Sequence, residues 1–160
     1  MTVLTTPNIQ IADVRHLDRM MTVMTGAFDP QFGEAWSASQ LAGSLALTDS
    51  FARQATDAAG GIIGFTLSRA ASVEVELLLI AVAVSHRIGG VGRLLVETVI
   101  DDALRRGSSE VFLEVRENNV AARRLYQSVG FVDIGARPNY YTGTAGDRFS
   151  AITMRRHVHA

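Results

Sequence analysis

The chain has 160 residues, of which 48% are hydrophobic, and a formal net charge of -1 at pH 7. This length suits a single domain, residues 1–160, that can bury its own core. The nearly balanced charge gives no overall basic character for nucleic acid, and no apolar run approaches the roughly 20 residues of a membrane span. Residues 1–7 lack the basic start and long apolar core of a signal peptide. We therefore expect a cytoplasmic protein, monomeric or homodimeric, without nucleic-acid or membrane partners.

Two reactive residue types are missing from the chain. It contains no cysteine, and all 15 of its Lys and Arg residues are Arg. The first absence excludes disulfides, thiolate metal sites and a cysteine acyl-enzyme. The second excludes a P-loop lysine and Schiff-base chemistry. Two explanations for the missing lysine stay open: compositional bias of the source genome, and avoidance of nucleophilic amines by an enzyme that handles an activated acyl group.

The first half of the chain predicts a strand, two helices and a β-hairpin. Met20, Met21 and Met24 share one face of the first helix, which marks that face as core. The expected bounds are Ile9–Val14 for the strand, Leu17 to about Gly26 for the first helix, a second helix capped by Ser37, and Phe51–Thr56 and Ile62–Leu67 for the hairpin.

The second half predicts a strand–helix–strand unit and then a helix with two further strands. The expected bounds are Val73–Val84, a helix from the glycine loop to Arg106, Val111–Arg116, a helix from Asn119 to Val129, and strands Phe131–Ala136 and Phe149–Arg155. Gly107 and Gly130 are suited to end the two helices. The element order predicts an α/β domain with a mixed sheet and helices on its faces.

A glycine-rich segment, Arg87-Ile88-Gly89-Gly90-Val91-Gly92-Arg93, joins an apolar strand to a helix. A strand–turn–helix of this kind aims backbone N–H groups and the positive end of a helix dipole at one spot, where a phosphate fits. A dinucleotide loop needs a third glycine, but Leu95 stands there, and a P-loop needs lysine. The pattern Arg-x-x-Gly-x-Gly remains, either as another kind of phosphate site or as a tight turn that binds nothing.

A second group of candidate residues follows about 30 residues later. Glu114 is an acid inside the apolar strand and is flanked by Leu113 and Val115. Burial there raises its pKa towards the range of a general base, unless a nearby Arg pairs with it in a purely structural ion pair. Asn119 and Tyr126 are seven residues apart and are expected on one face of the next helix, where Tyr126 alternatively serves only in helix packing.

The segment from Phe112 to Phe131 resembles the GCN5-related N-acetyltransferases (GNAT), as does the loop Arg-x-x-Gly-x-Gly. The segment contains the pattern Leu-Glu-Val-Arg-x-x-Asn-x-x-Ala-x-x-Leu-Tyr-x-x-x-Gly-Phe. This pattern resembles the sequences of the branch that acetylates the N-terminal alanine of a ribosomal protein. The resemblance extends over roughly residues 9–155. It implies a mixed, mostly antiparallel sheet with a central splayed strand and helices on both faces, and acetyl-coenzyme A as co-substrate.

The resemblance also implies roles for individual residues. Glu114 would be the general base, acting through a water, and Tyr126 the acid that protonates the departing thiolate. Tyr140 and Tyr141, on a loop with Asn139, would bind the acceptor. The residues that would bind acetyl-coenzyme A are Ile80, Ala81 and Val82 at the splayed strand, Arg87, Ile88, Gly89, Gly90, Val91, Gly92 and Arg93 in the loop, and Asn119. No metal is implied.

Acid–base chemistry favours an N-terminal amine as the acceptor. A peptide α-amine has a pKa of about 7.7–8.0, so roughly 10–20% of it is neutral at pH 7, whereas a lysine amine at about 10.4 is almost entirely protonated. One partly buried carboxylate is a sufficient base for the first and a weak one for the second. A small-molecule amine as acceptor, and an acyl-coenzyme A-binding protein without catalysis, remain as alternatives.

Overall fold

The computed structural model describes residues 6–87 and 89–159. The strands are β1 (Asn8–Ala12), β2 (Ser50–Thr56), β3 (Ile62–Ala71), β4 (Glu74–Val82), β5 (Glu110–Arg116), β6 (Val132–Thr142) and β7 (Arg148–His157). The helices are α1 (Leu17–Ala27), α2 (Ala38–Leu45), α3 (Val91–Arg105) and α4 (Val120–Ser128), with short 3₁₀ turns η1 (Val14–His16), η2 (Pro30–Phe32) and η3 (Val84–His86). None of the helices within these ranges is long and apolar enough to cross a bilayer.

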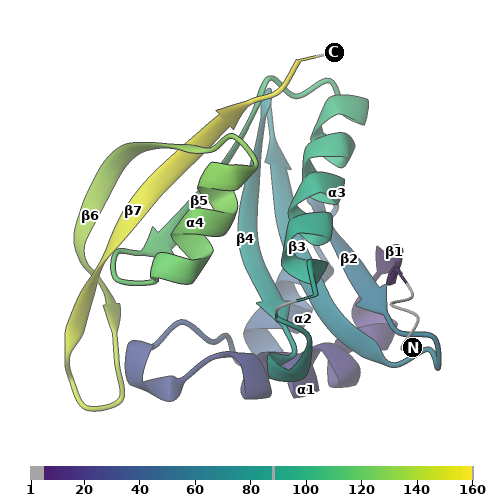
Figure 1. Ribbon diagram of the computed structural model, residues 1–160, viewed down its shortest axis with the longest axis horizontal. Helices are drawn as coiled ribbons and strands as arrows, with labels where there is room; N and C mark the ends of the chain where they lie inside the picture. Colours follow the sequence, from purple (N-terminus) through teal and green to yellow (C-terminus); the bar gives the residue numbers. More distant parts are fainter. Residues whose placement is uncertain (1–5, 88, 160) are drawn as a thin grey trace.

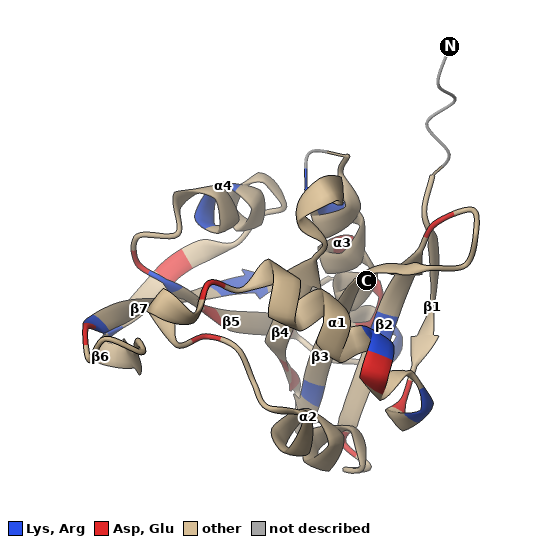
Figure 2. Ribbon diagram, turned by 90° about the horizontal axis from the view of Figure 1, so that it is seen from below, with Lys and Arg blue, Asp and Glu red and all other residues tan. Residues whose placement is uncertain are grey.

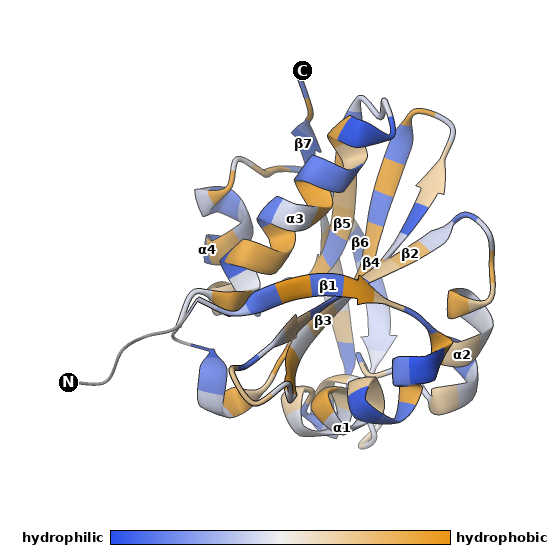
Figure 3. Ribbon diagram, turned by 90° about the vertical axis from the view of Figure 1, so that its right-hand side faces the viewer, coloured by the Kyte–Doolittle hydropathy of each residue, from blue (hydrophilic) through white to orange (hydrophobic). Residues whose placement is uncertain are grey.

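The seven strands form one sheet in the order β1-β2-β3-β4-β5-β7-β6. Only β4 and β5 run parallel, and the other neighbouring strands are antiparallel. Helices α3 and α4 cover one face, and α1 and α2 cover the other (Figures 1 and 3). The predicted mixed, mostly antiparallel sheet with helices on both faces is therefore confirmed.

Each helix layer has its own core, because the apolar stripe of each helix is buried against the sheet. On one side Val96 and Val99 of α3 and Tyr126 of α4 pack with Leu113 of β5. On the other side the methionines of α1 and Leu41 of α2 pack with Phe65 and Leu79. The predicted methionine face of α1 is therefore core: Met20 and Met24 are fully buried.

A bulge in β4 joins the two cores. In its pairing with β3, Leu67 faces Leu79 and Ser68 faces Leu77, so that Leu78 is an extra residue. A bulge of this kind turns the following side chains to the other face. Leu77 accordingly packs in the core under α3 and α4, whereas Leu79 packs in the core under α1 and α2.

The bulge coincides with the point where β4 parts from β5. The parallel ladder pairs Glu74 to Leu77 with Glu110 to Leu113 and goes no further. Beyond Leu77 the edge of β4 that faces β5 has no strand partner among the described residues, so its backbone N–H and C=O groups are free to bind something else. This is the splayed strand that the resemblance implied, and the gap it opens holds the candidate site.

Several predicted strand ends were wrong. The strands expected to end at Val14 and Ala136 end at Ala12 (β1) and Thr142 (β6), and the ends of β3 and β4 differ as well. We expected β3 to end at Leu67, but it continues to Ala71 because its polar end pairs with the start of β4 in a tight turn. We expected the next strand to reach Val84, but β4 ends at Val82, and the chain turns into η3, where Val84 is 62% exposed. An unbroken apolar run gives no sign of where the partner strand stops.

A buried ion pair fixes α3 to β2. Arg53 binds both carboxylate oxygens of Asp102, with Nε to Oδ2 at 2.9 Å and Nη2 to Oδ1 at 2.7 Å. The two side chains are only 20% and 7% exposed, whereas Arg105, which also reaches Asp102 at 3.4 Å, is 70% exposed. Arg53 is therefore the partner that compensates the buried carboxylate.

We expect Asp102→Ala to destabilise the protein by roughly 3 kcal/mol, because it leaves the Arg53 guanidinium buried without a counter-charge. Arg105→Ala is the matched control and should cost about 1 kcal/mol or less, since it removes only an exposed partner. Urea denaturation of the two variants measures both values. Equal losses of stability would contradict the assignment of Arg53 as the partner that matters.

Candidate active site

A pocket of ≈ 530 Å³ lies where β4 and β5 part. This volume is typical of a site for a small molecule. Both strands line it, together with the start of α3, the helix α4, the connection between α1 and α2, and β6. Most of the predicted site residues meet here: Ile80, Ala81, Val82, Arg87, Gly90, Gly92, Arg93, Glu114, Asn119, Tyr126, Tyr140 and Tyr141.

The start of α3 leaves backbone N–H groups uncapped on one side of the pocket. Gly90 is the N-cap, with φ +79°, and no side chain caps this end. Its carbonyl accepts the first helical hydrogen bond, from Leu94 N at 3.1 Å, so the N–H groups of Val91, Gly92 and Arg93 have no partner within the helix. A Cβ at Gly90 would meet nothing within 4 Å. Open space in front of free N–H groups is what a phosphate group requires.

The other loop residues have more varied positions. Gly92 lies close to α4, since a Cβ there would be 3.2 Å from Leu125 Cδ2. The side chain of Val91 is only 2% exposed and packs in the core with Leu95, so only its backbone can bind a ligand. Ile88 lies outside the described residues, and the exposed Gly89 is not part of the pocket lining.

The two arginines of the loop are engaged by protein groups. Arg87 donates from Nη2 to the carbonyl of Ala27 at the end of α1. Arg93 pairs with Glu97 at 3.0 Å and donates to Ser128 Oγ of α4 at 3.3 Å. Both side chains line the pocket, so their positive charge still favours an anion there, but their hydrogen bonds stabilise the loop against α1 and α4.

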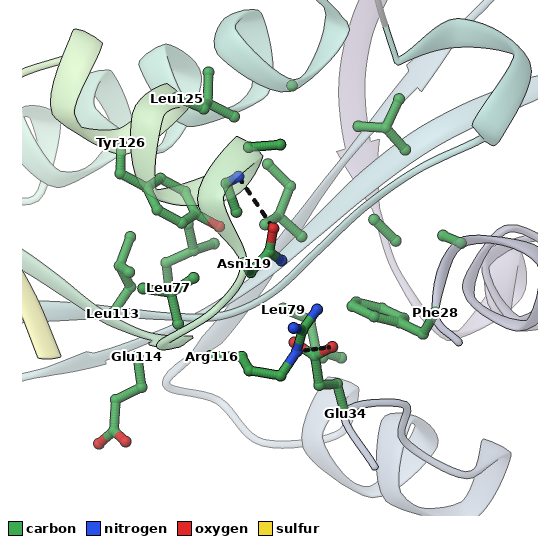
Figure 4. Close-up of a pocket in the computed structure, with 18 of the residues that line it drawn as sticks. Phe28, Glu34, Leu77, Leu79, Leu113, Glu114, Arg116, Asn119, Leu125 and Tyr126 are labelled. Carbon is green, nitrogen blue, oxygen red and sulfur yellow. Dashed lines mark hydrogen bonds and ion pairs between the residues drawn. The ribbon is translucent and has the colours of Figure 1, made fainter. Parts of the chain in front are cut away.

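We had expected Asn119 to lie inside a helix, but it is the N-cap of α4. The helix begins at Val120, and Asn119 Oδ1 accepts a hydrogen bond from Ala122 N at 3.2 Å. This hydrogen bond fixes the side-chain amide and leaves Nδ2 as a donor within the pocket (Figure 4). Because capping by asparagine is common, the sequence alone is compatible with either position.

Glu114 lies on β5 with its side chain on the face opposite Tyr126. Leu113 and Val115 pack in the same core as Tyr126, and side chains alternate along a strand. Figure 4 accordingly shows the Tyr126 hydroxyl directed towards Asn119 and the Glu114 carboxyl group pointing the other way. The acid and the phenol thus lie on either side of the strand edge that borders the gap.

The Glu114 carboxyl group is buried and only half satisfied. Its side chain is 10% exposed, Oε1 forms an ion pair with Arg137, whose Nε lies 3.0 Å away, and Oε2 is buried without a hydrogen-bond partner in the described structure. Burial raises its pKa above the usual value, Arg137 opposes that rise, and the carboxylate of Glu76 adds to it. Glu114 is therefore paired with an arginine, as one interpretation of the sequence had it, and its second oxygen has no partner in the described structure. Its role as a base stays a prediction.

Tyr126 is 5% exposed on α4 and packs edge-on against Phe131, with ring centroids 5.9 Å apart. Burial raises the pKa of its hydroxyl well above the usual value, and the carboxylate of Glu34 adds to the rise. The phenol therefore keeps its proton throughout the neutral range and is suited to donate it. Tyr126 is thus both a core residue and a pocket residue.

The pocket contains a second ion pair with little exposure, which was not predicted from the sequence. Glu34, from the connection between α1 and α2, accepts from Arg116 Nε of β5 at 3.1 Å, and the two side chains are 13% and 9% exposed. The Arg116 guanidinium also lies 3.5 Å above the ring of Phe32. Arg116 belongs to the motif that carried the family resemblance. Nothing near Glu34 in the sequence marks Glu34 as a pocket residue, because its partner Arg116 is 82 residues away.

Tyr140 and Tyr141 lie in a strand and not on the loop that we predicted. Both belong to β6, whose pairing with β7 shifts between Arg137 and Tyr141. Asn139 in this irregular stretch has φ +56°, which turns the chain locally. The two rings meet edge to face, 4.9 Å apart, and both line the pocket. Contact of the two tyrosines with the acceptor stays a prediction.

Two distant segments meet to close the side of the pocket where Glu34 and Tyr140 lie. The connection between α1 and α2 runs beside the hairpin of β6 and β7 (Figure 2), and Phe32 contacts Phe149 with ring centroids 5.1 Å apart. Their backbones touch: a Cβ at Gly143 would be 1.8 Å from the carbonyl oxygen of Gln31. Only glycine permits this contact.

Comparison with known proteins agrees with this geometry. A [Ribosomal protein bS18]-alanine N-acetyltransferase of Escherichia coli is 40% identical over 95 residues, which are 59% of this chain and 64% of that protein. One from Haemophilus influenzae is 37% identical over 93 residues, 58% of this chain and 63% of that protein. The curated relatives are thus matched over less than two thirds of their length.

The crystal structure of the ribosomal-protein-S18-alanine N-acetyltransferase from Escherichia coli superposes with a TM-score of 0.86 at 30% identity. The superposition covers 97% of this chain and 96% of that one. Residues 17–131 match the acetyltransferase (GNAT) family. This match spans more than half of the chain and includes the α3 loop, Glu114 and Tyr126, and so the chain belongs to the acetyltransferase (GNAT) family.

Proposed function

We propose that this protein transfers an acetyl group from acetyl-coenzyme A directly to the N-terminal α-amine of a protein, with alanine as the first residue. The observation that carries the proposal is the buried Glu114 carboxyl group, with one oxygen held by Arg137 and the other without a partner, beside the gap between β4 and β5. The names of the similar proteins from Escherichia coli and Haemophilus influenzae support the choice of acceptor.

The residues on the α3 and α4 side fit the donor. The free N–H groups after Gly90 would hold the pyrophosphate, and the positive charge of Arg87 and Arg93 favours it. Asn119 Nδ2 and the unpaired edge of β4 beyond Leu77 would hold the pantetheine arm and the thioester carbonyl. When bound, acetyl-coenzyme A supplies an activated acetyl group, and the protein needs no nucleophile of its own.

The two proton transfers would involve Glu114 and Tyr126, which lie on different sides of β5. Glu114 would accept the proton that the acceptor amine loses, directly or through a water. Tyr126 would give its proton to the departing thiolate, a role that suits a phenol held protonated by burial. Glu34, Tyr140 and Tyr141 also line the pocket, where they would bind the first residues of the acceptor.

Glu114→Gln tests the assignment of the base. We expect kcat/KM for a peptide with a free N-terminal alanine to fall by about 10²–10⁴, whereas titration calorimetry should show unchanged binding of acetyl-coenzyme A. Thiol release measures the rate. Unchanged turnover would refute the base, and tight donor binding without thiol release from any acceptor would point to a binding protein.

The acceptor itself is tested with matched amines. The panel contains the free peptide, the same peptide blocked at its N-terminus and carrying an internal lysine, and a polyamine. We expect clear preference for the free α-amine, because it is the least basic of the three. Preference for the polyamine would contradict the proposed acceptor and leave the base assignment intact.

Loss of activity in Glu114→Gln should not come from unfolding. Because the folded protein raises the pKa of this carboxyl group, ionisation is harder in the folded state than in the unfolded one, and stability falls as pH rises through the folded pKa. At neutral pH the variant escapes that cost, so its Tm should equal or exceed that of the native protein. A clearly lower Tm would show that the Arg137 pair stabilises the fold.

Tyr126→Phe should lower kcat by about 10²–10⁴ and leave the Tm nearly unchanged, because the ring still packs against Phe131. A donor with a more acidic thiol leaving group should recover part of the lost rate, since it needs less help from an acid. Stopped-flow measurement of thiol release with the two donors checks both points. An equal rate loss for both would mean that Tyr126 does not protonate the leaving group.

A further inference from the structure

Arg137 reaches Glu114 across an intervening strand. Glu114 of β5, Thr153 of β7 and Gly135 of β6 form one row across the sheet, and Arg137 lies two residues further along β6 on the same face. A Cβ at Gly135 would meet nothing within 4 Å, so this row offers no bulky side chain to block the guanidinium. Its Nε contacts Glu114 Oε1 at 3.0 Å.

This ion pair is unequal in burial. The Glu114 side chain is 10% exposed and that of Arg137 is 61% exposed. A pair with one solvated partner contributes little to stability, because water screens it. The guanidinium also lies 5.5 Å from the ring of Tyr140, which lines the acceptor side of the pocket. Arg137 therefore connects the buried acid with the surface on which the acceptor would rest.

The contact leaves the two oxygens of Glu114 in different states. Oε1 is held by Arg137, and Oε2 is buried with no hydrogen-bond partner among the described residues. A carboxyl group bound at one oxygen cannot rotate freely, so its second oxygen has a fixed direction. Fixed direction is a requirement for efficient proton transfer.

Several groups face Glu114 and set its charge. On β4 Glu76 repels it, although Arg69 of β3 pairs with Glu76 at 3.0 Å. On β6 Arg137 attracts it, and the neutral phenols of Tyr140 and Tyr141 lie within its field. Its neighbour on β7, Thr153, carries no charge. Arg137 is thus the positive group that opposes both burial and Glu76.

We propose that Arg137 is a positioning residue for acetyl transfer, which holds Oε1 of Glu114 so that Oε2 receives the proton of the acceptor amine. This inference rests on the proposed role of Glu114 as the base. It assigns to Arg137 the task of keeping the base oriented and ionised while its own side chain stays at the surface, within reach of the incoming acceptor.

The sign of the effect follows from the charges. A general base works only when it is ionised, so activity falls as pH drops through the pKa of Glu114. Removal of Arg137 removes a group that lowers this pKa, and the acid limb of the profile should move to higher pH. Removal of the Glu76 charge should move the limb to lower pH.

The test is the pH dependence of kcat/KM with the alanine peptide for Arg137→Gln, Arg137→Lys and Glu76→Gln. We expect Arg137→Gln to shift the acid limb upward and to lower the rate at neutral pH by up to about 100-fold. Arg137→Lys should restore most of the loss, and Glu76→Gln should shift the limb downward. Arg123→Gln is the matched control, because it breaks another pair to β6, with Asp133 at 3.0 Å, and should shift nothing.

The double variant separates this inference from the proposed function. In Glu114→Gln, the further change Arg137→Gln should have no effect on the rate, because Arg137 acts through Glu114. If Glu114→Gln itself is fully active, the proposed function fails. If Glu114→Gln is inactive but Arg137→Gln alone keeps the native pH profile, or changes only the KM of the acceptor, the positioning role of Arg137 is wrong.

Discussion

The separation of β4 from β5 after Leu77 and Leu113 is the constraint on which the whole site depends. A parallel pair of central strands would normally stay hydrogen-bonded along its length, and ending the ladder early leaves backbone groups without partners. The bulge at Leu78 makes this possible, because it gives the following residues a new core under α1 and α2. Packing of these residues under α1 and α2 thus keeps the end of β4 apart from β5, and the unpaired edge of β4 can bind a ligand.

Two of the acids that line the pocket, Glu34 of the α1–α2 connection and Glu114 of β5, differ in how their charge is compensated. Glu34 is fully compensated by Arg116, which is itself buried and further held by the ring of Phe32. Breaking such a buried pair is costly, and the pair serves to fix the wall of the pocket. Glu114 has an exposed partner and a free oxygen, so its protonation can change at a modest cost in free energy. The contrast supports Glu114 as the reacting acid.

Local features of the sequence were enough to predict most elements and the uncapped helix start at Gly90. Gly90 acts through its own backbone, and such a role is visible in a short motif. What the sequence did not reveal depends on distant contacts. Glu34 gains its role only through Arg116, 82 residues away. The resemblance placed Tyr140 on a loop, yet pairing with β7 resumes at Tyr141 and keeps the segment in the sheet.

The arrangement also explains why a direct transfer needs an acid and a base that do not touch. Tyr126 belongs to the face covered by α3 and α4, where the donor would bind, and Glu114 belongs to the opposite face. If the two groups lay within hydrogen-bond distance, the phenol would donate a hydrogen bond to the carboxylate, which would make Glu114 a weaker base and would occupy the proton that the thiolate needs. Because β5 stands between them, each group stays available for its own reactant, and the reactants meet only at the gap between β4 and β5.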